Sequence, residues 1–360
     1  GPLCAGLRYS GCNVFDLEQT TTPVLNFAIC HGDTANCGVM ITASHNPGCY
    51  NGFKIVLEGQ VIPSEGIQAL KAMMAANDAP MKTEGSLAAL GIVPSYLDHI
   101  VADNKLSRAF KLVIDGGNSV SGPIAVELFE RLGCRVEPLF CTIDGNFPNH
   151  DPNPSEEKNL QPLIAQVKST GADLGLAFDG DGDRLVAVSH LGEIVWPDRL
   201  MMIFARDLLT NSPGSSVVFD VKSSKRLGEL IEQYSGVPIM CKTGHSHIRK
   251  TVIDTNALLG GEFSGHLFFN DRWYGFDDGC YAAMRLLEVL SAQTHGDVSS
   301  LDQMISKFEP TSYTPEILVP VTEDNKFRIM QTLISECKFP GGTISPLDGL
   351  RVEYEHGWGL

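Results

Sequence analysis

The sequence predicts a multi-domain α/β protein: three similar α/β domains with mixed sheets, followed by the start of a different, α+β domain. Three short apolar runs each end in an aspartate, at Lys111–Asp115, Leu174–Asp179 and Val217–Asp220. Amphipathic helical patterns alternate with these runs, for example over Pro123–Leu132 and Arg199–Leu209. This alternation indicates α/β units, in which ligands collect at the carboxyl ends of the strands.

The length of 360 residues exceeds what one hydrophobic core organises, so we expect about two to four domains. Polar, loop-like segments place the boundaries near residues 103, 195 and 310. The predicted domains are therefore 1–103, 104–195, 196–310 and 311–360. We expect the first and the fourth to be incomplete, because the chain starts abruptly and stops within a strand-like segment.

Composition excludes several classes of protein. No apolar run approaches the ~18 residues of a membrane helix and no signal peptide opens the chain, so we expect no membrane partner. The net charge of −16 argues against a nucleic-acid partner. Ten cysteines without a C-x-x-C pair indicate free thiols and a cytoplasmic location. The oligomeric state stays open, with a monomer as the simplest expectation.

The first chemical signal is a serine loop, T-A-S-H-N-P at residues 42–47, directly after the apolar run 38–41. Serine is a poor nucleophile and needs an adjacent base or a phosphorylated resting state. His45 lies beside Ser44, and Lys54 enters the next strand, from which it could return a cation to the loop. The alternative is structural: Ser44 would close a polar turn and Lys54 would face solvent.

The second signal is an aspartate loop, D-G-D-G-D-R at residues 179–184. Asp179, Asp181 and Asp183 can converge if the intervening glycines let the backbone curl, and such close carboxylates repel unless a cation holds them. Mg²⁺ suits carboxylate and phosphate oxygens, and Arg184 could bind a further phosphate or sugar oxygen. An EF-hand is excluded, because arginine replaces its glycine and strands flank the loop. A solvated acidic turn is the structural alternative.

A phosphatase is a competing interpretation of the same loop. An apolar strand followed by D-x-D also places the nucleophile of haloacid-dehalogenase-type phosphatases. Asp179 would then be the nucleophile, with Asp277 and Asp278 as the distal acidic pair and Ser44 incidental. The third aspartate and the elaborate serine loop argue against this interpretation.

A third segment, the glutamate loop at residues 262–266, combines a carboxylate, a hydroxyl and an imidazole next to glycines. Glu262, Ser264 and His266 would suit the vicinal hydroxyls of a sugar, although a capped turn explains them equally well. His245 and Lys222 follow strands and are candidate substrate contacts. No nucleotide-binding glycine motif follows any strand.

Taken together, these loops make the chain resemble the α-D-phosphohexomutase family, and within it the bacterial phosphomannomutase/phosphoglucomutase type. T-A-S-H-N-P is similar to the phosphoserine loop, D-G-D-G-D-R to the magnesium loop and G-E-F-S-G-H to the sugar-recognition loop. The segments N-G-F-K, F-D-V-K, K-T-G-H-S, D-G-N-F-P-N-H and G-F-D-D-G also match. The resemblance spans essentially the whole chain and implies four domains around a central cleft.

The resemblance implies reversible phosphoryl transfer between the 1- and 6-positions of mannose and glucose phosphates. Ser44 would carry the phosphoryl group at rest, and glucose 1,6-bisphosphate or mannose 1,6-bisphosphate would be intermediate and activator. Mg²⁺ would bind Asp179, Asp181, Asp183 and an oxygen on Ser44. The implied catalytic residues are Ser44, His45, Lys54 and Arg184, and the implied substrate contacts are Lys222, His245, Glu262, Phe263, Ser264, Gly265 and His266.

Three departures from the family pattern affect these expectations. The family's N-terminal tyrosine–arginine segment is absent before Gly1, and its Arg/Ser/Thr phosphate-binding loop would follow Leu360. A complete chain would then be an impaired enzyme or a non-catalytic binder of sugar phosphates, whereas a fragment would come from a competent protein. Phe263 stands where methionine is common in this subfamily, which leaves the sugar preference open. Phosphoglucosamine mutase, whose sugar loop is similar, is the nearest alternative.

Overall fold

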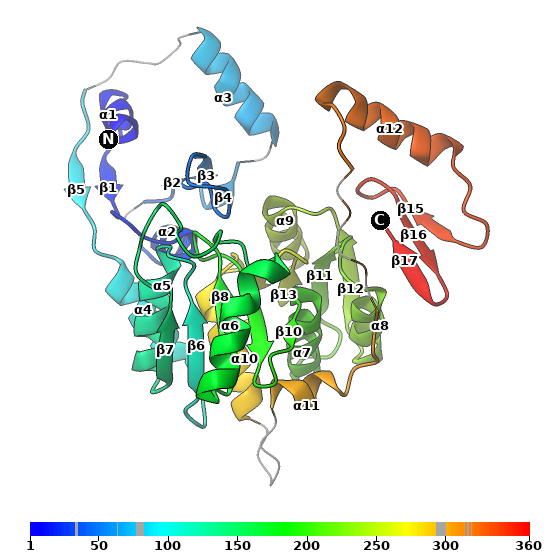
Figure 1. The fold of residues 1–360 in the computed structure, drawn as a ribbon. Coiled ribbons are helices and arrows are strands. Elements are labelled where there is room, and N and C mark those ends of the chain that lie inside the picture. Colours follow the sequence, from blue (N-terminus) through cyan, green and yellow to red (C-terminus); the bar gives the residue numbers. More distant parts are fainter. Residues whose placement is uncertain are drawn as a thin grey trace.

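The computed structural model describes residues 1–32, 35–62, 64–76, 83–292, 300–312, 314, 317 and 319–360. Figure 1 shows a central α/β body, with N-terminal elements above it and a C-terminal helix and strands beside it. Two sheets with both parallel and antiparallel neighbours form this body. The predicted α/β architecture with mixed sheets is confirmed.

The first of these sheets lies in the predicted second domain and has the strand order β10-β9-β8-β6-β7. Its elements are β6 (Lys111–Asp115), α5 (Ser121–Arg131), β7 (Arg135–Leu139), α6 (Glu157–Thr170), β8 (Leu174–Phe178), β9 (Leu185–Ser189) and β10 (Ile194–Val195). β6 is parallel to β7 and β8, whereas β9 is antiparallel to β8. Every residue of β8 and β9 is buried, as expected for strands covered on both faces.

The second sheet lies in the predicted third domain and has the order β12-β11-β13-β14. Its strands are β11 (Ser216–Asp220), β12 (Val237–Cys241), β13 (Leu259–Gly261) and β14 (Leu267–Phe269), and its helices are α7 (Pro197–Asn211), α8 (Lys225–Gln233), α9 (His245–Thr255), α10 (Gly279–Ser291) and α11 (Leu301–Ile305). β11 is parallel to both of its neighbours. The apolar runs that precede Asp179 and end at Asp220 are therefore interior strands.

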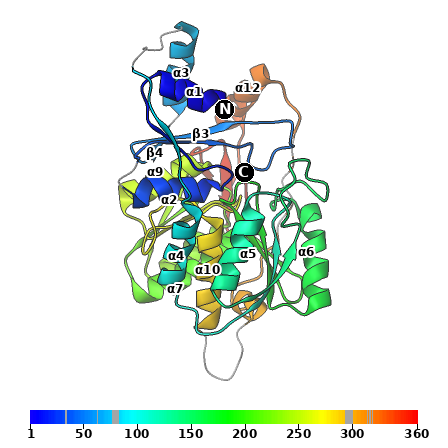
Figure 2. The ribbon, with the colours of Figure 1, turned by 90° about the vertical axis from the view of Figure 1, so that its left-hand side faces the viewer.

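Helix α10 joins the two sheets. All of its residues are buried, and it contacts α7 and β14 of one sheet as well as β9 and α5 of the other. Figure 2 shows α10 beside α5 in the middle of the body. One hydrophobic cluster runs through both parts, from Leu112 and Leu176 to Phe219 and Leu286. The two sheets therefore share a core. This core fixes the positions of the loops at their strand ends relative to one another.

The N-terminal part contributes short strands and helices. Its elements are α1 (Pro2–Tyr9), β1 (Val14–Asp16), α2 (Thr22–His31), β2 (Gly38–Ile41), β3 (Phe53–Leu57), β4 (Gln60–Val61), α3 (Ser64–Ala76), β5 (Leu87–Ala89) and α4 (Val93–Asp103). β1 pairs with β5, and β2, β3 and β4 form a separate sheet. In this sheet Lys54 lies opposite Met40, close to the end of β2 from which the serine loop starts.

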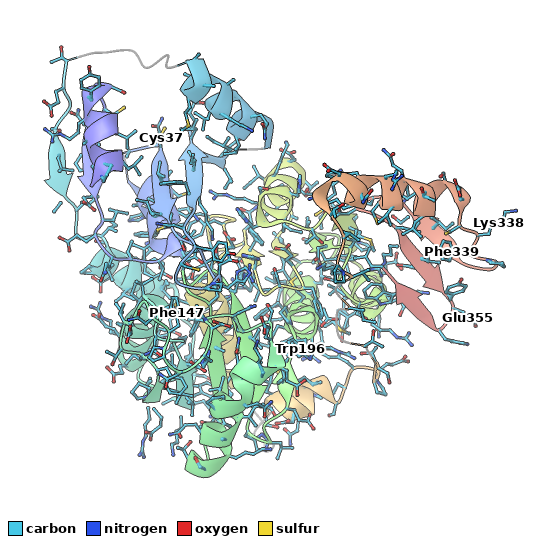
Figure 3. All side chains as sticks on the ribbon, turned by 45° about the horizontal axis from the view of Figure 1, so that its top comes forward. Cys37, Phe147, Trp196, Lys338, Phe339 and Glu355 are labelled. Carbon is cyan, nitrogen blue, oxygen red and sulfur yellow. The ribbon has the colours of Figure 1, made fainter. Side chains whose placement is uncertain are left out.

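The C-terminal part consists of α12 (Glu323–Glu336) and the antiparallel strands β15 (Thr343–Ser345), β16 (Arg351–Tyr354) and β17 (Gly357–Gly359). Figure 3 shows Lys338, Phe339 and Glu355 at its outer end, away from the α/β body. Its contacts with the body include the start of β16, where Arg351 is 1% exposed and donates to the Val221 and Ser223 carbonyls.

Two chain-wide expectations can be compared with the structure. All ten cysteines are free thiols, as their scattered spacing predicted. Among the described residues, no helix combines the length and the apolar character needed to cross a membrane.

Asp278 ties the N-terminal part to the start of α10. Its side chain caps this helix by accepting a hydrogen bond from the Tyr281 backbone N–H at 3.0 Å. The Tyr96 hydroxyl on α4 donates to the same carboxyl group at 2.9 Å. Both side chains are buried, and burial raises the pKa of Asp278 to about 7. The folded chain therefore holds a proton on this group more readily than the unfolded chain does.

We expect Asp278→Asn to remove part of the pH dependence of folding. An unfolded aspartate ionises near pH 4, so between about pH 4 and 7 the folded state binds the extra proton and wild-type stability falls as pH rises. Asparagine does not titrate and can still cap α10. Thermal unfolding midpoints measure this: as the pH rises from about 4 to 7, the midpoint of the variant should rise relative to that of the wild type. A difference that is independent of pH would contradict the argument.

Candidate active site

The serine loop meets the aspartate loop at a direct hydrogen bond. Ser44 follows β2 with a φ of +52°, a left-handed conformation that few non-glycine residues adopt and that often marks functional sites. Its backbone N–H donates to Thr42 Oγ1 at 2.8 Å, which closes the turn. The Ser44 hydroxyl donates to Asp179 Oδ2 at 2.9 Å and lies 3.1 Å from His45 Nδ1. The two loops singled out in the sequence therefore form one site.

The aspartate loop curls so that its carboxylates converge. Asp179 Oδ1 accepts hydrogen bonds from the backbone N–H groups of Gly182 (3.0 Å) and Arg184 (3.2 Å). Gly182 has a φ of +77°, which favours glycine. Oxygens of Asp179, Asp181 and Asp183 lie within 4.8 Å of one another, and all three residues are buried. The alternating sequence positions are thus brought to one point.

Two other glycines allow the close contacts around this loop. A Cβ added to Gly180 would lie 2.0 Å from the Ser44 carbonyl oxygen. A Cβ added to Gly279, at the start of α10, would lie 2.6 Å from the Arg184 carbonyl oxygen. The aspartate loop is therefore enclosed between the serine loop and the first turn of α10.

Lys54 reaches the carboxylates from β3. Its Nζ donates to Asp181 Oδ2 at 2.6 Å and to Asp183 Oδ2. Burial alone would lower the pKa of Lys54, but Asp183 and Asp181 outweigh burial and raise this pKa above its usual value. Burial, followed by Asp183 and Asp181, raises the pKa of Asp179. Lys54 is therefore a charged ammonium that offsets only part of the negative charge.

The donor set fits Mg²⁺. Asp181 Oδ1 is buried, and no donor within the described part of the chain hydrogen-bonds to it. A buried carboxylate oxygen without a donor is costly unless a cation takes that place. Mg²⁺ prefers carboxylate oxygens and usually binds through a few of them together with a phosphate. Asp179, Asp181 and Asp183 would hold the ion, with the Ser44 hydroxyl beside it.

The glutamate loop lies against the aspartate loop on the other side. The Leu185 backbone N–H donates to the Gly265 carbonyl at 3.0 Å, and Arg184 forms an antiparallel β-bridge with His266, so backbone contacts join the two loops. Gly265 has a φ of +104°. His266 Nδ1 lies 2.8 Å from Glu262 Oε2, and His266 Nε2 lies 3.3 Å from Asp183 Oδ1. One imidazole therefore connects the two acidic groups.

The two site histidines next to these loops differ in charge. Burial lowers the pKa of His266, but Asp183 and the hydrogen bonds to Asp183 and Glu262 raise it to about 10. For His45, burial followed by the nearby Arg184 lowers the pKa to about 4. His266 is consequently a cation between carboxylates, whereas His45 presents a neutral imidazole to the Ser44 hydroxyl.

Three more predicted residues border this group. The His245 ring lies 5.8 Å from the His266 ring, measured between centroids. Ser264 Oγ lies 2.8 Å from His266 Nδ1. Arg184 Nε lies 3.7 Å from Asp179 Oδ2, so the guanidinium adds positive charge beside the carboxylates.

Lys222 and Phe263 are linked to the site through Asp220. Lys222 is half-buried on the turn after β11, and Ser223 Oγ on this turn donates to Asp220 Oδ1 at 2.7 Å. The Phe263 backbone N–H donates to the same oxygen at 3.2 Å. The Phe263 ring stacks on Trp196 with centroids 6.4 Å apart.

Sequence reasoning missed two polar contributors. The Thr22 hydroxyl, at the start of α2, donates to Asp181 Oδ2 at 2.6 Å. The run of three threonines at residues 20–22, directly before Pro23, was the available signal, since hydroxyl side chains gather at helix starts. Asp220 was visible only as a strand end, and its function as a junction of loops depends on distances that the sequence does not contain.

Three family models match the chain. They are the α/β/α domains I, II and III of phosphoglucomutase/phosphomannomutase, which match residues 2–81, 94–192 and 196–309. A phosphomannomutase/phosphoglucomutase of Pseudomonas aeruginosa is 49% identical over 360 residues, which cover 99% of this chain and 76% of that protein. A phosphoglucomutase of Neisseria gonorrhoeae is 46% identical with the same coverage, 99% and 76%.

A solved structure agrees with these sequence matches. The X-ray structure of a phosphoglucomutase/phosphomannomutase family protein from Burkholderia thailandensis is similar to this chain with a TM-score of 0.93 at 42% identity. The match covers 99% of this chain and 77% of that one.

We expect Lys54→Met to make stability depend more strongly on Mg²⁺. Without the metal, loss of the ammonium leaves Asp181 without its cation and Asp183 with His266 alone, which should cost roughly 3 kcal/mol. Added Mg²⁺ can replace that charge, so it should raise the unfolding midpoint of the variant by more than that of the wild type. Thermal unfolding in EDTA and in Mg²⁺ measures the difference.

Lys158→Met is the matched control for this experiment. Lys158 pairs with Glu156 at 2.7 Å, but its side chain is 69% exposed and lies outside the cluster. This variant should respond to Mg²⁺ as the wild type does. If Mg²⁺ raised the unfolding midpoints of all three proteins equally, Lys54 would not be neutralising the charge of the carboxylates.

Proposed function

Because the chain belongs to the phosphoglucomutase/phosphomannomutase family, we propose that it moves a phosphoryl group between the 1- and 6-positions of hexose phosphates. The observation that supports this best is the 2.9 Å contact between Ser44 Oγ and Asp179 Oδ2, which places a hydroxyl at the edge of a buried carboxylate cluster. Mannose and glucose phosphates are the proposed substrates, since relatives carry the names of both activities.

In the proposed cycle Ser44 carries a phosphoryl group at rest. Transfer breaks the bond between phosphorus and Ser44 Oγ and forms a bond between phosphorus and the free hydroxyl oxygen of the sugar. The sugar hydroxyl loses one proton and Ser44 Oγ gains one, so the exchange is balanced. The hexose 1,6-bisphosphate then returns its other phosphoryl group to Ser44 by the same exchange, which leaves the isomeric monophosphate.

The charged side chains around Ser44 have separate proposed roles. Lys54 is the candidate general acid/base that carries the proton between the two oxygens. Arg184 and the protonated His266 place positive charge where negative charge spreads over the phosphoryl oxygens. His45 orients the Ser44 hydroxyl through their 3.1 Å contact. Bound Mg²⁺ would supply further neutralisation of the phosphoryl charge.

The proposed substrate contacts lie on three loops of the second sheet. Glu262 and Ser264 would read the 3- and 4-hydroxyls of the sugar in either orientation, and Glu262 suits this task because its pKa of about 2 keeps it an acceptor. Burial opposes that low pKa, but the hydrogen bond to His266 outweighs it. The full proposed set is Lys222, His245, Glu262, Phe263, Ser264, Gly265 and His266.

An aspartyl phosphatase built on Asp179 is less well supported. Asp179 Oδ1 accepts two backbone hydrogen bonds, and its other oxygen accepts one from Ser44. Asp278, which would be half of the distal acidic pair, instead caps α10 and bonds Tyr96. The Ser44 hydroxyl is the better placed nucleophile.

We also propose a cellular location and partners for the protein. We infer a cytoplasmic location, which the ten free thiols support. The proposed partners are small hexose phosphates, with glucose 1,6-bisphosphate or mannose 1,6-bisphosphate as activator.

The decisive experiment follows the covalent phosphate. After incubation with glucose 1,6-bisphosphate and Mg²⁺, we expect the intact mass to increase by one phosphoryl group, with peptide mapping on Ser44. Excess glucose 1-phosphate should remove it again. Ser44→Ala should take up none, whereas Ser169→Ala, at an exposed serine on α6, should behave as the wild type. Phosphate on Asp179 would support the phosphatase, and no covalent phosphate would refute the cycle.

A second prediction concerns the approach of the two loops. Gly180→Ala puts a methyl group 2.0 Å from the Ser44 carbonyl oxygen, so the serine loop must move away from Asp179. Since displacements of about 1 Å can cost ~100-fold in rate, we expect mutase turnover to fall at least that far. Gly145→Ala is the control, because its Cβ meets no atom within 4 Å. Near-normal turnover of Gly180→Ala would refute the importance of this contact.

A further inference from the structure

The C-terminal part reaches the loops of the second sheet through one buried side chain. Arg351, the first residue of β16, is 1% exposed. Its Nη1 donates to the Val221 carbonyl and, at 2.9 Å, to the Ser223 carbonyl. These two carbonyls flank Lys222. The guanidinium therefore clamps the turn that carries this lysine.

The clamp is oriented by the C-terminal sheet itself. Arg351 Nε donates to Glu353 Oε1 at 2.7 Å, and the guanidinium carbon lies 4.0 Å from the centroid of the Trp358 ring. Glu353 and Trp358 face each other across β16 and β17. A planar guanidinium held along one edge and one face has little freedom, so its position on the turn follows that of the sheet.

A second contact comes from the segment just before β16. Asp348 Oδ2 accepts a hydrogen bond from the Thr243 backbone N–H at 3.0 Å. Thr243 precedes Gly244, whose φ of +126° is a glycine conformation, and His245, which begins α9. The loop that carries His245 is thus held by the same C-terminal segment as the turn that carries Lys222.

Asp220 connects both of these to the glutamate loop. Its fully buried carboxylate accepts from Ser223 Oγ at 2.7 Å, from Thr243 Oγ1 at 3.2 Å and from the Phe263 backbone N–H at 3.2 Å. Each donor belongs to a different loop. The Gly244 backbone N–H also donates to Glu262 Oε1 at 2.7 Å. A displacement of any one loop would therefore leave a buried acceptor unpaired in the next.

We propose that Arg351 and Asp348 are positioning residues for sugar-phosphate binding. Through them the C-terminal part sets the spacing between Lys222, His245 and Glu262, the groups proposed to meet the phosphate and the sugar hydroxyls. Arg351 is too deeply buried to contact a substrate itself, so it acts through the turn that it clamps. The identity of the ligand in this inference rests on the proposed function. The control of the loops rests on the hydrogen bonds alone.

Hydrogen exchange tests the control of the loops without any activity measurement. Arg351→Lys keeps the charge but removes the planar group whose Nη1 bonds both carbonyls and whose Nε bonds Glu353. Asp348→Ala removes the acceptor for Thr243 at a half-buried position. We expect amides in all three loops, residues 220–224, 242–246 and 262–266, to exchange roughly tenfold faster in both variants. The aspartate loop, residues 179–184, should be unchanged.

Lys225→Ala is the matched control. Lys225 Nζ donates to the Tyr354 carbonyl at 3.4 Å, so it also joins the second sheet to β16, but from α8 and outside the three loops. Exchange in the loops should stay at the wild-type rate in this variant. Equal acceleration in Lys225→Ala, or none in Arg351→Lys and Asp348→Ala, would overturn the inference.

Kinetics with glucose 1-phosphate then separates positioning from general packing. Both loop variants should raise KM roughly tenfold and change kcat by less than about twofold, because the loops bind substrate while Ser44 and its carboxylates stay in place. Unchanged KM together with faster loop exchange would refute the positioning role. Failure of the wild type to bind glucose 1-phosphate would reject the proposed function and its ligand, whereas the exchange rates would still decide whether Arg351 and Asp348 control the loops.

Discussion

The burial of three carboxylates within 4.8 Å of one another is the constraint on which the rest of the site depends. Like charges at this separation repel by several kcal/mol at protein dielectric, and burial removes the water that would otherwise screen them. The surrounding fold offsets this with backbone amides on Asp179, the Thr22 hydroxyl and Lys54 on Asp181, and Lys54 with His266 on Asp183. These groups come from segments far apart in the chain, so the cluster itself draws the N-terminal part onto the two sheets.

The compensation is incomplete, since neither Asp181 Oδ1 nor Asp183 Oδ1 accepts a hydrogen bond from the described residues, although His266 Nε2 lies 3.3 Å from the second. Further donors on these oxygens would compete with a divalent cation, whereas a cluster without any compensation would destabilise the fold. Lys54 meets both conditions in part, because its ammonium neutralises some of the carboxylate charge while Asp181 Oδ1 stays without a donor among the described residues. The same ammonium thus belongs both to the stability of the fold and to the proposed chemistry.

Local patterns were enough to predict the loops, whereas tertiary distances were needed to see how they combine. The serine and aspartate loops could be predicted because their residue types, glycines and preceding strands all lie within a few positions of one another. Lys54 could be placed because β3 returns antiparallel to β2. The buried helix α10, the pairing of Tyr96 with Asp278 and the junction at Asp220 could not, because each joins segments through packing that no local period reveals.

The two strand-end aspartates Asp179 and Asp220 show what decides the role of such a residue. Both follow or end interior strands, and both are fully buried, so the sequence pattern treats them alike. Asp220 is surrounded by three donors from three loops, which satisfy its carboxylate and make it a fixed structural junction. Asp179 has two further carboxylates as neighbours, and Arg184 and Lys54 offset only part of their charge. The neighbours, rather than the strand position, separate a carboxylate that is fixed as a structural junction from one whose surroundings fit a cation.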